Sequence, residues 1–122
     1  MSKNVLVVDD SPTMRSLIVT TIEDMDGLEA TEVQNGIEAL KVLPTRKFDL
    51  IITDINMPTI NGLEIVRFVK GHPLYKMIPL IIVSTEQGDK EIQKALALGA
   101  TEYITKPFHP DNLKKVVQKV LN

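Results

Sequence analysis

In this 122-residue sequence, three aspartates and a serine stand at the ends of short apolar runs, and a lysine stands two residues after Ile104. They are Asp9, Asp10, Asp54, Ser84 and Lys106. Carboxylates that converge repel one another, and a hard divalent cation such as Mg²⁺ relieves that repulsion by binding their oxygens. Beside a cation and an ammonium, a carboxylate can attack a phosphoryl group, because phosphoryl transfer depends on positioning and charge neutralisation. The residue types indicate a phosphoryl-accepting site.

Asp54 is the preferred acceptor on position. It is a single aspartate after a central apolar run, where a cation held by the pair Asp9 and Asp10 could bridge to an incoming phosphoryl group. Chemistry alone leaves the other two aspartates open as acceptors.

The apolar runs predict the strands that must position these residues. Runs at 5–8, 50–52 and 80–83 lack polar alternation, which is typical of central strands covered on both faces. More polar segments at 29–34 and 101–105 predict edge strands.

Helical patterns lie between and after the strands. Ser11 and Pro12 provide an N-cap and a first-turn proline for the first helix, and a stripe of apolar residues after Asp111 predicts the last. Three weaker helices are predicted at 36–43, 62–70 and 90–98. The result is a (βα)5 chain of the α/β class.

Alternating strands and helices imply a doubly wound parallel sheet with right-handed crossovers. Ligands of such sheets bind at the carboxyl ends of the strands, so the polar residues after each strand should meet at one crevice. We expect one domain over residues 1–122, without an output domain.

Composition excludes several other classes of protein. The chain has no cysteine, only two histidines and a formal net charge of −2, which gives no support to a disulfide framework, a zinc site or a nucleic-acid footprint. No long apolar segment indicates a membrane partner or a signal peptide, so we expect a cytoplasmic protein. No G-x-G-x-x-G follows the first strand, which argues against a flavin or dinucleotide enzyme.

Taken together, these positions resemble the receiver domain of bacterial two-component response regulators, in the stand-alone chemotaxis form. The resemblance covers the whole chain, and its motifs are Asp9-Asp10, Asp54 followed by Met57-Pro58 and Gly62, Ser84, and Lys106-Pro107. It implies a flavodoxin-like sheet of order 2-1-3-4-5. It also implies a signalling switch that catalyses only its own phosphoryl uptake and hydrolysis.

The resemblance assigns a role to each site residue. Asp54 would be phosphorylated by a histidine kinase, and Mg²⁺ would be ligated by Asp10, Asp54 and the backbone carbonyl of Asn56, with Asp9 acting through water. Ser84 and Lys106 would contact the phosphoryl oxygens.

Tyr103 would be the aromatic switch whose rotation follows Ser84, although edge strands also favour tyrosine for packing. A cis peptide bond would join Lys106 and Pro107.

Three further residues would tune the rate at which the phosphoryl group is gained and lost. Asn56 and Glu86 lie two residues beyond Asp54 and Ser84, although simple surface polarity would also explain them. Thr85 stands where the family usually has a small residue, and its branch should slow access to the phosphoryl group.

The implied partners are a histidine kinase, an output protein and a phosphatase that resets the switch. In the family, the output surface combines the fourth helix, last strand and last helix, which here draws on Gly88, Asp89, Glu91, Ile92, Tyr103, Val116 and Lys119. Gly88-Asp89 replaces a lysine pair of the chemotaxis regulators, which puts flagellar motor binding in question. We expect a monomer, with a phosphorylation-dependent dimer left open. The alternative functions are a phosphorelay intermediate and a phosphorylation-independent scaffold.

Overall fold

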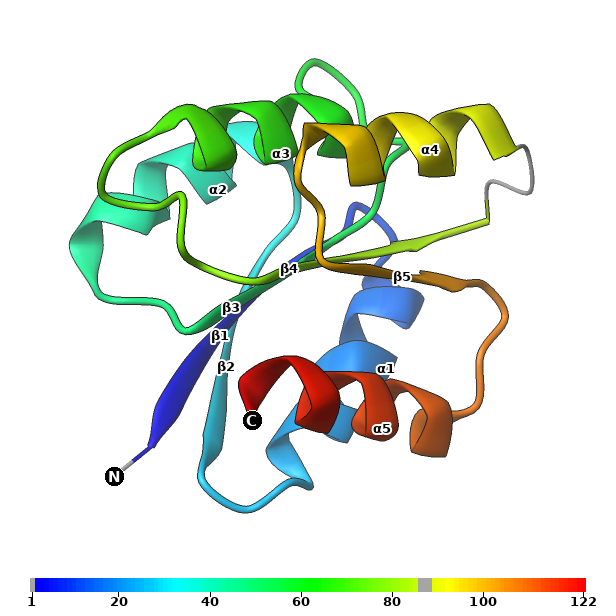
Figure 1. Ribbon diagram of the computed structural model, residues 1–122. Helices are drawn as coiled ribbons and strands as arrows, with labels where there is room; N and C mark the ends of the chain where they lie inside the picture. The colour runs from blue at the N-terminus through cyan, green and yellow to red at the C-terminus, as the bar shows by residue number, and fades with distance from the viewer. Residues whose placement is uncertain (1, 86–88) are drawn as a thin grey trace.

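Strands and helices alternate along the chain, and the computed structural model describes residues 2–85 and 89–122 (Figure 1). The strands are β1 (Lys3–Val8), β2 (Leu28–Val33), β3 (Leu50–Thr53), β4 (Leu80–Ser84) and β5 (Glu102–Thr105). The helices are α1 (Pro12–Glu23), α2 (Gly36–Val42), α3 (Gly62–Gly71), α4 (Asp89–Leu98) and α5 (Pro110–Leu121), with a short 3-10 turn, η1 (Leu43–Thr45), after α2.

The strands form one five-stranded parallel sheet of order β2-β1-β3-β4-β5. This is the flavodoxin-like order that the resemblance to receiver domains implied, so that expectation is confirmed. Every residue of β3 and β4 is buried, whereas β2 and β5 are only partly buried. The continuous apolar runs therefore mark the central strands and the polar runs mark the edges, as expected for a sheet covered on both faces.

Two helical layers cover the sheet. Figure 1 shows α1 and α5 on one face and α2, α3 and α4 on the other. Because side chains alternate along a strand, β1 supplies both layers: Leu6 and Val8 join the core under α2, α3 and α4, and Val5 and Val7 join the core under α1 and α5. None of the described helices has the length and apolar character needed to cross a membrane.

Most element boundaries lie within a residue or two of the predicted ones, and two differences have a local cause. The second helix ends at Val42 because the chain tightens into η1 at Leu43, ahead of Pro44. The last helix starts at Pro110, so Asp111 lies inside its first turn, and His109 is the N-cap residue whose Nδ1 accepts the Asp111 N–H at 3.1 Å. A helix that follows Asp111 would begin at residue 112, so the expected start was late by two residues.

The start of α3 carries a reciprocal capping box, from which a first prediction follows. Asn61 Oδ1 accepts the Glu64 N–H at 3.0 Å, and Glu64 Oε1 accepts the Asn61 N–H at 3.2 Å. Replacing Asn61 by alanine removes one of these bonds and should lower the free energy of unfolding by about 1 kcal/mol. Urea denaturation measures the change. Asn61→Asp keeps the acceptor and should stay close to wild type; an equal loss in both variants would contradict the capping role.

Candidate functional site

The carboxyl edge of the sheet brings Asp9, Asp54 and Lys106 into direct contact. Asp9 follows β1, Asp54 follows β3 and Lys106 follows β5. The Lys106 ammonium lies 2.9 Å from Asp9 Oδ2 and 3.3 Å from Asp54 Oδ2, and all three side chains are buried. Residues separated by up to 97 positions in sequence thus form one ion cluster, as the strand-end pattern predicted.

Asp10 adds a third carboxylate to this cluster. Oxygens of Asp9, Asp10 and Asp54 all lie within 4.8 Å of one another, with Asp10 exposed and the other two buried. Lys106 pairs with two of these three carboxylates, so the formal charges of the four groups leave a negative excess. Oxygen donors with excess negative charge suit a hard divalent cation such as Mg²⁺, and exposed Asp10 gives a cation access from solvent. The residues present therefore fit the predicted metal.

Asp9 is held in place on both sides of its carboxylate. Its Oδ1 accepts the Ser11 N–H at 2.9 Å while Oδ2 faces Lys106. Its backbone carbonyl accepts a hydrogen bond from Arg15 Nη1 at 2.8 Å, and Arg15 Nε binds Glu32 at 2.9 Å. Sequence reasoning missed Arg15. Its position one turn into α1 was a usable signal, but a contact with a backbone carbonyl is invisible in a residue pattern.

Burial raises the pKa of the Asp54 carboxyl above its usual value. The positive charge of Lys106 opposes this shift, and the negative charge of Asp9 reinforces it. Asp54 Oδ1 also accepts the Ile55 N–H at 2.7 Å, which favours the ionised form. Buried Thr53 donates its hydroxyl to the Asp54 carbonyl at 3.0 Å, so the backbone of the predicted acceptor is fixed as well as its side chain.

Gly62, at the start of α3, packs against the backbone of Asp54. The Gly62 N–H donates to the Ile55 carbonyl at 2.9 Å, and a Cβ atom at Gly62 would come within 2.1 Å of the Asp54 carbonyl oxygen. Only glycine permits this approach. The Gly62 of the predicted motif is therefore explained by its close packing against the backbone of Asp54.

Ser84 and Lys106 lie at the ends of neighbouring strands. Ser84 is buried, and its carbonyl accepts the Lys106 N–H at 2.8 Å, which ties β4 to the lysine backbone. The Lys106–Pro107 peptide bond is cis, so that prediction is confirmed. Thr85 is exposed, and Asn56 is exposed two residues beyond Asp54. Glu86 lies outside the described residues.

The predicted output surface is only partly exposed. Tyr103, on the edge strand β5, is 43% exposed, and exposed Lys119 pairs with Glu102 at 2.8 Å. Ile92 is buried and belongs to the core side of α4, so its placement on this surface was wrong. The helical period turns Ile92 inward while Glu91 stays partly accessible.

The structure describes only some of the remaining residues of the predicted output surface. Val116 is half-buried against the core under α5. Gly88 and the side chain of Asp89 lie outside the described residues.

Comparison with known proteins identifies the family. The model of the response regulator receiver domain matches residues 5–118. The chain belongs to this family. A chemotaxis protein CheY homolog of Campylobacter jejuni is 43% identical over 118 residues, which cover 95% of this chain and 90% of that protein. The solved structure of Vibrio cholerae CheY4 superposes with a TM-score of 0.92 at 38% identity, covering 99% of this chain and 100% of the other.

A more distant receiver domain bears on the acidic cluster. The receiver domain of the Pseudomonas aeruginosa sensor histidine kinase PA1611 has a TM-score of 0.87 at 25% identity, covering 99% of this chain and 98% of that one. Its structure is described with a magnesium ion coordinated in the active-site cleft. Receiver domains of two-component signalling act as switches between a histidine kinase that donates a phosphoryl group and an output partner.

The close approach of Gly62 to the Asp54 backbone predicts a loss of stability on substitution that the glycine at the other end of α3 should not share. Gly62→Ala should force α3 away from the Asp54 backbone and lower the free energy of unfolding by about 2 kcal/mol or more. Gly71→Ala, at the other end of α3, meets no atom within 4 Å and should be neutral or slightly stabilising. Chemical denaturation of both variants tests the difference, and a Gly62→Ala protein as stable as Gly71→Ala would contradict it.

Proposed function

We propose that this receiver takes a phosphoryl group on Asp54 from a phosphohistidine of a kinase partner. The contact of Lys106 with both Asp9 and Asp54, at 2.9 and 3.3 Å, is the observation that carries the proposal. It places a fixed positive charge beside the one buried carboxylate that follows the central strand, with Asp10 at the solvent side.

In this proposal an Asp54 oxygen attacks phosphorus, a P–O bond forms, and the P–N bond to the donor imidazole breaks. Lys106 stabilises the charge on the transferred oxygens. Asp10, Asp54 and the Asn56 carbonyl would hold Mg²⁺, with Asp9 acting through water. When bound, that cation supplies charge neutralisation and a template for the phosphoryl oxygens. Asp9, held by Ser11 and Lys106, keeps the acidic side of the site in place.

Residues on β4, on β5 and directly after β5 would then respond to the phosphoryl group. Ser84 and Lys106 engage the new oxygens, and Tyr103 moves from its exposed position towards the space behind Ser84. The added charge shifts an equilibrium between two forms of the receiver. Tyr103, Glu91 and Lys119 then present an altered surface to the output protein.

The CheY relatives favour chemotaxis as the pathway. We propose that residues 1–122 function as one receiver domain, a monomer reset by hydrolysis with the help of a phosphatase. Asn56 and Glu86 would set the pace of that hydrolysis.

Phosphoryl uptake provides the direct test. Incubation with acetyl phosphate and Mg²⁺ should add one phosphoryl group by intact-protein mass spectrometry, and excess EDTA should abolish the addition. Asp54→Asn should gain none because it lacks the nucleophile, while Asp26→Asn, an exposed aspartate, should react like wild type. An adduct that survives in Asp54→Asn would move the acceptor elsewhere, and no adduct in wild type would favour a phosphorylation-independent scaffold.

Thr85 offers a second test of the site. Its exposed, branched side chain directly follows Ser84 and should hinder both donors and attacking water. Thr85→Ala should therefore increase phosphorylation and dephosphorylation rates several-fold, measured by tryptic peptide phosphorylation over time. Thr85→Val keeps the branch and should retain the wild-type rates. Unchanged rates in Thr85→Ala would rule out steric control by this residue.

A further inference from the structure

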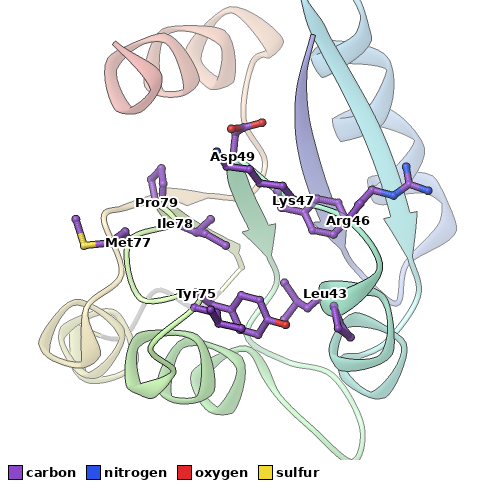
Figure 2. A pocket seen from close by; sticks show the side chains of 11 residues that line it. Leu43, Arg46, Lys47, Asp49, Tyr75, Met77, Ile78 and Pro79 are labelled. Atoms are coloured by element: carbon purple, nitrogen blue, oxygen red, sulfur yellow. The ribbon is translucent and has the colours of Figure 1, made fainter. Parts of the chain in front are cut away.

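A second concave site lies at the amino edge of the sheet, opposite the acidic cluster. Its cavity has a volume of about 520 Å³ and lies between the segment that leads into β3 and the segment that leads into β4. Figure 2 shows the side chains of Leu43 and Tyr75 facing each other from these two segments, with Ile78 and Pro79 beside them. We call this cavity, with the adjoining residues 43–49 and 74–79, the amino-edge groove.

Two of the lining side chains are apolar and far more exposed than a core residue. Leu74 is 78% exposed and Met77 is 83% exposed. Isolated exposed apolar residues are common, but here they adjoin a mainly apolar cavity. Methionine is frequent at surfaces that bind apolar peptide side chains because it is flexible and polarisable.

Local hydrogen bonds hold this exposed segment in shape. The His72 carbonyl accepts the N–H groups of Tyr75 and Lys76 at 3.0 and 2.9 Å, and the Tyr75 carbonyl accepts the Ile78 N–H at 2.9 Å. Lys70 Nζ donates to the Ile78 carbonyl at 2.7 Å and to the Lys76 carbonyl at 3.2 Å.

The Tyr75 ring is also fixed from the side. It stacks on His72 with ring centroids 4.3 Å apart. The groove is therefore preformed, which lowers the entropy cost of binding.

The rim of the groove is positively charged on a chain whose net charge is −2. Arg46 and Lys47 are exposed beside the cavity, and Lys76 is exposed on the neighbouring segment. Asp49 is the one carboxylate among the lining residues that the structure describes. Its Oδ2 accepts the Asn4 N–H at 2.9 Å, so part of its hydrogen-bonding capacity is used within the protein.

We propose that the amino-edge groove binds an acidic amphipathic helix of a partner protein. Apolar side chains one helical turn apart would enter the cavity and cover Leu74 and Met77, while flanking carboxylates would pair with Arg46 and Lys47. A second copy of this chain is the poorer occupant, because a two-fold contact through this surface would oppose the same basic residues. The site is separate from Asp54 and binds with or without a phosphoryl group there.

A designed peptide tests the proposal. The probe is a synthetic helix with leucine at i, i+3, i+4 and i+7 and glutamate on its flanks, titrated into the isotope-labelled full chain and followed by amide NMR shifts. Shifts should concentrate at 43–49 and 72–79. The double variant Leu74→Ser/Met77→Ser and the double variant Arg46→Glu/Lys47→Glu should each weaken binding by about tenfold or more. A peptide with lysine in place of glutamate should bind at least about tenfold more weakly.

Matched controls separate the groove from general surface effects. Leu17→Ser on α1 and Lys115→Glu on α5 change an exposed apolar and an exposed basic residue elsewhere and should leave peptide affinity unchanged. Native amide spectra of every variant verify folding. Equal binding of the lysine peptide, shifts centred on another surface, or no saturable binding would each overturn the proposal. So would a wild-type dimer that Leu74→Ser/Met77→Ser dissociates, since the groove would then be a self-association surface.

Discussion

The candidate site at the carboxyl ends of the strands depends on the buried contact of Lys106 with Asp9 and Asp54. Burying charged groups is costly unless they are paired, and removing one partner leaves an uncompensated charge. One ammonium serves two buried carboxylates, with Asp10 close by. The cluster is therefore held together and still short of positive charge. In our proposal, a bound cation supplies that missing charge before the phosphoryl group arrives.

The same lysine connects the chemistry to the surface of the protein. Lys106 directly follows β5, an edge strand that also carries exposed Tyr103, and its N–H is bonded to the carbonyl of buried Ser84. In our proposal, a movement of Lys106 onto a phosphoryl oxygen would therefore act on an edge strand with partly exposed side chains. Central strands buried on both faces could not respond as easily, because close-packed cores resist deformation. In our proposal, the placement of the lysine directly after β5 couples phosphorylation to a change at the protein surface.

The carboxyl ends and the amino ends of the strands lie on opposite sides of the sheet and carry side chains of different charge and polarity. The carboxyl edge gathers carboxylates, while the amino edge presents Leu74 and Met77 beside the basic residues Arg46 and Lys47. The fully buried strands β3 and β4 lie between them. This separation allows a partner to occupy the amino edge without contacting the residues that would receive the phosphoryl group.

Local patterns in the sequence determined the alternation of strands and helices, the central and edge strands, and the gathering of Asp9, Asp54 and Lys106 at one edge. These features follow from hydrophobic periodicity and from the geometry of parallel sheets. Choosing Asp54 over the other aspartates required the family resemblance. Only the tertiary structure decided that Ile92 is buried in α4 and that the Arg15 side chain meets the Asp9 carbonyl. Such contacts join residues by the direction of their side chains and the packing of distant segments, neither of which a linear pattern contains.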